Sequence, residues 1–172
     1  MEATSIRYRH GEAGDLEAIT RLYNHYIRTS PCTFDTEPMA SRADWFAKFR
    51  TDGPHQLFVA VADGQLLGYA CSGTFKDKLA YATSAEVSVY VSANATGLGI
   101  GHSLYEQLFA SLETAPLHQL FAGITLPNDA SLRLHQRLGF THCGTFPEAG
   151  FKFGQFWDVA WLVRQAPGRG NR

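Results

Sequence analysis

The stretch that decides the fold is Glu86-Val87-Ser88-Val89-Tyr90-Val91, continued by Ser92-Ala93-Asn94-Ala95-Thr96 and then Gly97-Leu98-Gly99-Ile100-Gly101-His102-Ser103. Its β-branched first part predicts a buried strand, and its glycine-rich last part predicts a loop that opens into a helix. Such a loop presents free backbone N–H groups, together with the positive end of the helix dipole, to a phosphate. We therefore expect a phosphate-bearing ligand here, a few residues downstream of a carboxylate.

The two common nucleotide-binding motifs do not fit this loop. The dinucleotide fingerprint G-x-G-x-x-G requires a glycine where this chain has His102. The P-loop ends in G-K-[ST], whereas Gly101 is followed by His102 and Ser103. Taken alone, the glycine-rich string is equally compatible with a flexible turn or a close-packing device.

Composition limits the class of protein. A chain of 172 residues with 45% apolar and 13% aromatic content suits one domain with a sizeable core. A net charge of −1 without a long basic run makes a nucleic-acid partner unexpected. We expect a cytoplasmic protein with no membrane partner, because no apolar run resembles a signal peptide or a membrane span. Three scattered cysteines and unpaired histidines predict neither a disulfide framework nor a metal site.

The hydrophobic pattern predicts one α/β domain with a mixed sheet, over residues 1–165. A Pro/Gly/Arg-rich tail, 166–172, is predicted to be disordered. Helices are expected from Gly14-Asp15 to about Ser30-Pro31, from a capping pattern at Ser41 and Asp44, from the glycine loop to Leu112, and over 129–138. Strands are expected over residues 6–9, 57–62, 65–73 (joined to the previous one by a hairpin at Asp63-Gly64), 87–91, 118–125, 140–146 and 156–164.

A second segment, Asn128 through Phe140, reads N-D-A-S-L-R-L-H-Q-R-L-G-F. Together with the strand and glycine loop, it resembles the GCN5-related N-acetyltransferases (GNAT), and within them the phosphinothricin and methionine sulfoximine acetyltransferase branch. The segment Thr33–Pro38 followed by Trp45, and the pattern Gly150-x-Lys152-x-Gly154-x-x-Trp157-Asp158-Val159, also resemble motifs of that branch. The resemblance spans residues 6 to 164.

The resemblance implies a single GNAT domain: a mixed, mostly antiparallel central sheet flanked by helices, with splayed central strands. It implies acetyl-CoA as cosubstrate, without a metal, and a homodimer. The implied reaction is direct transfer of the acetyl group, in a ternary complex, to the primary α-amine of a small amino acid or toxic analogue such as phosphinothricin or methionine sulfoximine. A peptide or protein N-terminal acetyltransferase and a CoA-binding regulatory module without turnover remain as alternatives.

The residues expected to hold the cofactor fall in three groups. The family resemblance implies that the pyrophosphate of the cofactor lies on the glycine loop and the start of the helix. It also implies that the pantetheine arm lies along the strand and beside the second motif. The family usually begins this loop with Gln or Arg and often has a further basic residue before the first glycine. This chain has Asn94 and Thr96 at those positions, so we expect the backbone to bind the phosphates almost alone. The cofactor set is Val89, Tyr90, Val91, Gly97, Leu98, Gly99, Ile100, Gly101, His102, Asn128 and Ser131.

Glu86 and His135 are the expected catalytic residues. An amine must lose a proton before it attacks, and Glu86 is the candidate base; the alternative is a sheet-edge carboxylate paired with a lysine. His135 is a candidate proton donor to the departing thiolate, with positioning of substrate or cofactor, or a purely structural role, as alternatives. Candidate acceptor-binding residues are Phe34 and Tyr81 as pocket walls, and Lys76 and Lys78 for an acceptor carboxylate; the alternatives are core packing and solvated lysines.

Overall fold

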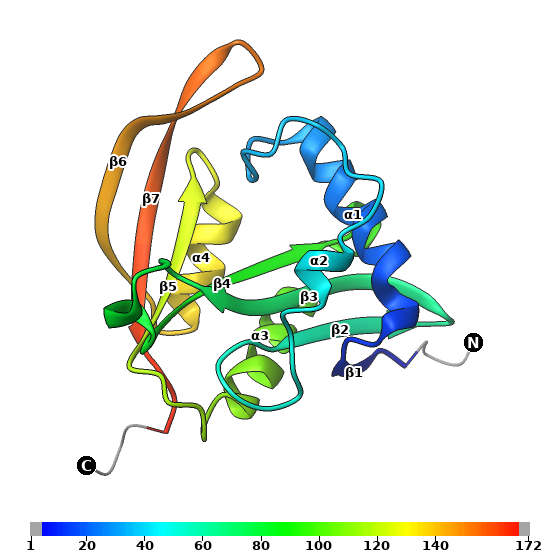
Figure 1. Cartoon of the computed structure of the whole chain (residues 1–172). Coiled ribbons are helices and arrows are strands. Elements are labelled where there is room, and N and C mark those ends of the chain that lie inside the picture. Colours follow the sequence, from blue (N-terminus) through cyan, green and yellow to red (C-terminus); the bar gives the residue numbers. More distant parts are fainter. Residues whose placement is uncertain (1–4, 169–172) are drawn as a thin grey trace.

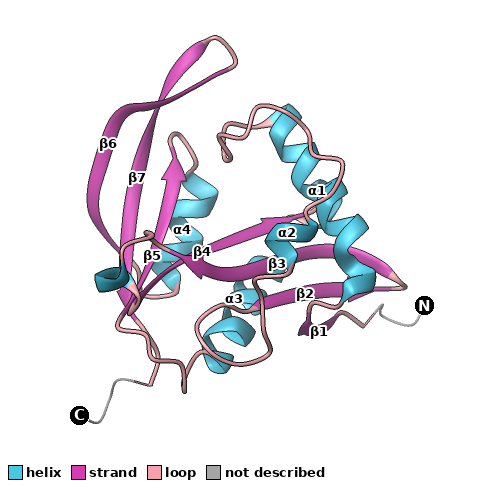
Figure 2. Ribbon diagram, in the orientation of Figure 1, coloured by secondary structure: helices cyan, strands magenta, loops and turns pink. Residues whose placement is uncertain are grey.

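The computed structural model describes residues 5–168, which form one seven-stranded sheet with helices on both faces (Figure 1, Figure 2). The strands lie in the order β1-β2-β3-β4-β5-β7-β6, and every neighbouring pair is antiparallel except β4 and β5. This is the mixed, mostly antiparallel sheet that the sequence predicted. The strands are β1 (Arg7–His10), β2 (Leu57–Ala62), β3 (Gln65–Thr74), β4 (Ser84–Val91), β5 (Gln119–Thr125), β6 (Thr141–Lys152) and β7 (Gln155–Gln165).

The longer helices bury apolar faces on opposite sides of the sheet. They are α1 (Leu16–Thr29) with the single turn α2 (Ala43–Phe46), and α3 (Ile100–Ser111) with α4 (Asp129–Arg137). On α3, Leu104 and Leu108 are fully buried in the core that also contains Val87 and Leu120 of the sheet. On α1, Ile19 packs with β2 and β3 residues in a second core on the other face. Burying these stripes, rather than helix propensity, stabilises such short helices. Three short 3-10 turns, η1 (Ala13–Asp15), η2 (Leu79–Tyr81) and η3 (Ala93–Ala95), complete the described elements.

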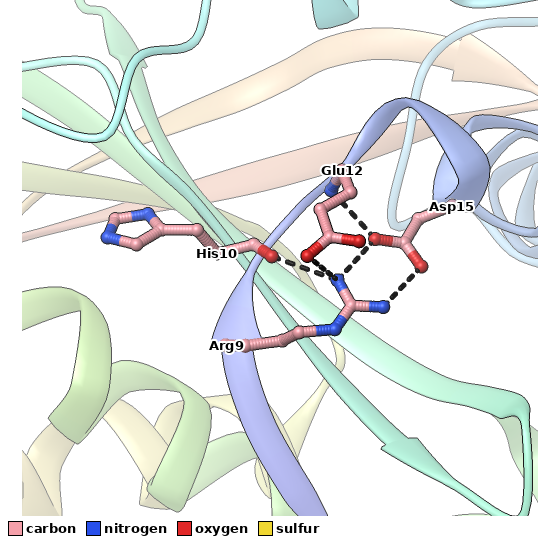
Figure 3. Close-up of polar contacts among 4 residues, drawn as sticks. All are labelled: Arg9, His10, Glu12 and Asp15. Atoms are coloured by element: carbon pink, nitrogen blue, oxygen red, sulfur yellow. Dashed lines mark hydrogen bonds and ion pairs between the residues drawn. The ribbon is translucent and has the colours of Figure 1, made fainter.

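An arginine–aspartate pair connects β1 to the start of α1 (Figure 3). The Arg9 guanidinium donates to both carboxylate oxygens of Asp15, at 2.7 and 2.9 Å, and Asp15 also accepts from the Glu12 N–H at 2.8 Å. Burial by itself raises the pKa of Asp15, but the bonds from Arg9 and the Glu12 N–H outweigh it and leave this pKa below its ordinary value. The pair fixes the angle at which α1 leaves the first strand.

The C-terminal hairpin is longer than the sequence pattern predicted. Strand β6 extends to Lys152 instead of ending near Phe146, and β7 begins at Gln155. The register shifts between Phe146 and Gly150, so a bulge absorbs Pro147, which has no N–H to donate to the ladder. The hairpin therefore projects past the rest of the sheet, towards the side on which α1 lies (Figure 1).

Both ends of the chain include residues outside the described range. Ala166, where the sequence analysis placed the start of a disordered tail, is buried, and its N–H donates to His118 O at 3.0 Å. Residues 169–172 of that predicted tail lie outside the described residues. No helix within residues 5–168 is long and apolar enough to cross a membrane.

Candidate active site

The site begins where the parallel strands β4 and β5 separate. Their pairing covers only Ser84–Glu86 against Gln119–Phe121, and beyond Glu86 the two strands diverge (Figure 1). Because Ser92 N–H donates to Leu67 O of β3, the alternation of an antiparallel ladder turns the backbone groups of Val87, Val89 and Val91 away from β3. Val87 adjoins the last parallel pair, Glu86 with Phe121, so Val89 and Val91 are the residues whose backbone groups face the gap. The splayed strands implied by the family resemblance are thus present, and they offer unpaired backbone groups to a ligand.

A cavity of about 910 Å³ lies on the α3 and α4 side of this gap. All of the residues expected to hold the cofactor line it, except Leu98, whose side chain is 65% exposed to solvent. The Val91 carbonyl already accepts a hydrogen bond from the Tyr26 hydroxyl. At this position only the N–H of Val91 is left to a ligand, whereas both backbone groups of Val89 face the gap.

The glycine loop has the backbone geometry of an anion site. Gly97 and Gly99 have φ of +78° and +75°, in the left-handed region that side chains disfavour. Gly99 is the N-cap of α3, so the first N–H groups of this twelve-residue helix open onto the cavity. A side chain at Gly101 would place its Cβ 3.3 Å from Leu134, so glycine there lets α3 pack closely against α4. These features fit a pyrophosphate bound largely through backbone.

Two arginines that the sequence analysis did not select also line this cavity. Arg133 and Arg137 stand one turn apart on α4. They are exposed, and they supply the positive charge that Asn94 and Thr96 do not. Their i, i+4 spacing behind Asn128 was the available signal, because residues so spaced share one face of a helix. Asn128 itself is the N-cap of α4, with its Oδ1 accepting from Ser131 N–H at 3.2 Å, so its amide nitrogen is available to a ligand.

His135 is buried between the two helices. Its Nδ1 lies 2.8 Å from Ser131 O, which can only accept, so Nδ1 carries the proton and Nε2 accepts from the Tyr105 hydroxyl at 3.0 Å. Burial lowers the pKa of His135, against a smaller opposing effect of the Ser131 bond, and favours the neutral ring. In this arrangement the Tyr105 hydroxyl gives its one hydrogen to His135 Nε2, and the Nδ1 hydrogen goes to Ser131 O, so both hydrogens are held inside the pair. Sequence reasoning missed Tyr105, which looked like one more apolar residue of α3.

A second cavity, of about 430 Å³, lies on the opposite face of the gap. Glu86, Ser88 and Tyr90 reach it from alternate positions of β4, while α1, the segment 32–45 and the β6–β7 hairpin form its other walls. The two cavities share lining residues, among them Ser88, Gly123 and Thr125, so they meet through the gap between the strands. Two ligands can therefore approach each other from opposite faces of one sheet.

Glu86 is half-buried in this second cavity. Burial raises the pKa of its carboxyl group. Within residues 5–168 no lysine or arginine lies within ion-pair distance of this carboxylate, which removes the expected alternative of a lysine-paired carboxylate at the sheet edge. A carboxylate with a raised pKa and no partner, at a cavity wall, can take up a proton from a ligand.

Comparison with known proteins identifies the family. The model of the acetyltransferase (GNAT) family matches residues 19–140. The chain belongs to the GNAT family. Of its relatives, a phosphinothricin N-acetyltransferase of Streptomyces coelicolor is 50% identical over 163 residues, covering 92% of this chain and 95% of the relative. An L-methionine sulfoximine/L-methionine sulfone acetyltransferase of Pseudomonas aeruginosa is 32% identical over 160 residues, covering 92% and 93%.

A solved structure points to the same family. A GNAT phosphinothricin acetyltransferase of Sinorhizobium meliloti, in complex with acetyl-CoA, superposes with a TM-score of 0.87 at 29% identity, over 97% of this chain and 92% of that one. The predicted GNAT fold and the predicted acetyltransferase activity are confirmed by these likenesses. The protein is an acetyltransferase whose chain has a cavity suited to acetyl-CoA.

The residues expected to bind the acceptor lie in different places in this GNAT domain. Phe34 lines the second cavity. The described residues that line this cavity do not include Lys76, Lys78 or Tyr81. Lys76 instead lies near Tyr81, its Nζ 5.5 Å from the ring centroid.

The wall that holds Phe34 is fixed by a buried lysine. Lys152 Nζ donates to Ser30 O at 2.9 Å and to Thr33 O at 2.7 Å. A Cβ at Gly150 would lie 2.1 Å from the Phe34 ring, so the ring packs directly on β6. The hairpin and the loop after α1 therefore act as one wall of the second cavity.

Proposed function

We propose that this protein acetylates the primary α-amine of a small amino acid or amino-acid analogue, with acetyl-CoA bound in the larger cavity and the amine in the smaller one. The observation that carries this proposal is the meeting of the two cavities beside an unpaired Glu86. The acceptor class follows the names of its relatives, which act on phosphinothricin and methionine sulfoximine or sulfone. A cavity of about 430 Å³ suits a molecule of that size.

The chain's own residues divide the work between the two faces. Backbone groups of Val89 and the N–H of Val91 would pair with the amide-rich arm of the cosubstrate, and the loop from Gly97 with Arg133 and Arg137 would hold its phosphates. Acetyl-CoA supplies the activated thioester. Glu86, directly or through a water molecule, would take the proton that the ammonium group loses, so that the amine attacks with a free lone pair.

The thiolate side of the reaction would involve Tyr105, which lines the larger cavity. In this structure the hydroxyl gives its one hydrogen to His135 Nε2, so it would donate to the thiolate only after turning that hydrogen away from the imidazole. We propose that His135 holds the Tyr105 hydroxyl in place and does not itself donate a proton. None of the three cysteines is needed as a nucleophile, which agrees with direct transfer in a ternary complex.

The test measures the release of CoA from acetyl-CoA with a thiol reagent, in the presence of phosphinothricin, methionine sulfoximine or methionine sulfone as the acceptor. The wild type should turn over at least one of them. Glu86→Gln should lower kcat by about 100-fold or more, the usual range for a lost general base, with the affinity for acetyl-CoA unchanged. Glu17→Gln, on the exposed face of α1, is the matched control and should retain activity. Binding of acetyl-CoA without turnover of any amine would contradict the proposal, and full turnover by Glu86→Gln would remove the base.

The protein is further proposed to be a homodimer that associates through the β6–β7 hairpin. Phe151, Phe153 and Phe156 are 60, 54 and 62% exposed at its projecting end, an apolar surface that water disfavours. Light scattering after gel filtration should give twice the monomer mass, and Phe151→Asp should shift the mass towards the monomer.

A cytoplasmic location is proposed because Cys32, Cys71 and Cys143 are free thiols. Fractionation of the source cell would test this location.

A further inference from the structure

The wall of the acceptor cavity contains an arginine held in an unusual setting. Arg42 is only 9% exposed, and its guanidinium is sandwiched between two aromatic rings, 3.8 Å from the centroid of Tyr23 and 3.7 Å from that of Trp45. Both faces of the planar group are thereby covered, so any further partner must approach its edge. Tyr23, Trp45 and Arg42 all line the second cavity.

This buried cation has no anionic partner within the described chain. Its Nη1 donates to the Tyr69 hydroxyl at 2.9 Å, and its Nε, which is buried, has no hydrogen-bond partner. Arg42 takes part in none of the ion pairs formed among residues 5–168. A buried charge without a counter-charge is costly, so a guanidinium edge without an anion at a cavity wall is a candidate site for an anionic ligand. The edge formed by Nε and Nη2, which Tyr69 leaves open, can bind a carboxylate through two parallel hydrogen bonds.

The strand register places this cation away from Glu86 along one cavity. Tyr69, the partner of Arg42, is opposite Tyr90, whereas Glu86 is opposite Gly73. Tyr90 is four positions beyond Glu86 in extended chain, which is about 13 Å between their backbones. The cavity thus has a carboxylate towards one end and a guanidinium towards the other, and Ser88 lies between them. An amino acid carries the complementary charges, an ammonium and an acid group.

We propose that Arg42 binds the anionic group of the acceptor and so selects amino acids over simple amines. The proposal rests on the proposed function, because it assumes that the acceptor enters the second cavity. It replaces Lys76 and Lys78, which do not line that cavity, as the cationic partner of the acceptor. The anion is either the α-carboxylate, which every amino acid has, or an acid group at the far end of the side chain, as in phosphinothricin.

The experiment measures kcat/KM for wild type, Arg42→Met and Arg42→Lys with acceptors that differ by one charge. Methionine sulfone against its α-carboxamide tests the α-carboxylate, and phosphinothricin against the neutral-ended methionine sulfone tests the distal group. Arg50→Met, an exposed arginine that donates only to nearby backbone carbonyls, is the control. The affinity for acetyl-CoA and the melting temperature report whether each variant is folded.

The expected result is a loss that depends on the acceptor's charge. Arg42→Met should lower kcat/KM by about 100-fold for acceptors with the bound anion, and by less than about threefold for those without it, since a charge-assisted pair is lost only with the former. Arg42→Lys keeps the charge without the fork and should lose about 10-fold, again only for the anionic acceptors. Arg50→Met should match the wild type.

Three results would overturn the proposal. Equal losses for charged and neutral acceptors would show that Arg42 only packs the wall. The proposal is also wrong if the wild type acetylates the carboxamide and the free acid with equal kcat/KM, and phosphinothricin no faster than the sulfone. Acceptor charge would then not affect the reaction. A wild type that acetylates no amino acid would refute the proposed function first, and that failure is recognised before any Arg42 variant is made. If Arg42→Met does not fold, the acceptor-dependence of Arg42→Lys decides.

Discussion

Substitution of Gly150 by alanine should damage the acceptor cavity without damaging the fold. The new Cβ would meet Phe34 ring atoms at 2.1, 2.3 and 2.5 Å. Because carbon atoms rest about 3.5–4.0 Å apart, the ring must move by more than about 1 Å. Phe34 is 38% exposed, so it can swing out at a cost in unfolding free energy below the 1–3 kcal/mol typical of an overpacked core. The cost appears instead in the shape of the cavity that the ring lines.

The expected loss is about 10- to 100-fold in kcat/KM for the amino acceptor, the scale on which a displacement of 1 Å affects catalysis. The KM for acetyl-CoA should not change, because neither residue lines the larger cavity. Gly144→Ala is the matched control, on the same strand and with nothing within 4 Å of the new Cβ. The double variant Gly150→Ala/Phe34→Ala should resemble Phe34→Ala alone. Unaltered acceptor kinetics in Gly150→Ala would refute the assignment of Phe34 to the wall.

Three further predictions concern other parts of the chain. Asp15→Asn should lower the unfolding free energy by about 1–2 kcal/mol at pH 7. Because the folded pKa of Asp15 is depressed, this difference from the wild type should persist above the unfolded pKa and vanish as the pH falls through the folded one, as urea titrations at several pH values would reveal. Replacing Arg133 and Arg137 together by glutamine should weaken acetyl-CoA binding about 10-fold at low salt and less at high salt, measured by calorimetry, with Arg21→Gln as control. His135→Ala should cost about 1–3 kcal/mol of stability without any substrate, because the buried Tyr105 hydroxyl loses its acceptor, and an unchanged denaturation midpoint would contradict this role.

The fold and the larger cavity could be predicted from the sequence, because both depend on backbone conformations that only certain residue types adopt. Gly97 and Gly99 are needed for their positive φ, and the strand before them shows its burial through β-branched residues. The ends of some elements were not readable. Ser41 does not cap the short helix by its side chain as expected: the N-cap is Arg42, and Ser41 Oγ accepts only from Ala43 N–H. The strand predicted to end at Phe146 continues to Lys152, because a bulge carries it past Pro147.

The acceptor side could not be predicted, because its residues acquire their roles only through tertiary contacts. Arg42 was not selected from the sequence, because two of the rings that surround it, Tyr23 and Trp45, come from separate segments. Tyr105 has the helical spacing of a core residue, and only its contact with His135 distinguishes its hydroxyl. Lys76 and Lys78 were selected for their charge and their place in the chain, which do not say which way a loop faces.

The placement of the two cavities on opposite faces of the sheet has a consequence for how such a protein can diversify. The donor side is built from the glycine loop, α3 and α4, whereas the residues from Phe34 to Trp45 and the β6–β7 hairpin appear only on the acceptor side. Changes in those two surface segments can alter which amine is accepted while the shared chemistry of the thioester stays intact. New substrate ranges are then accessible through small steps in peripheral segments, each of which keeps a working enzyme.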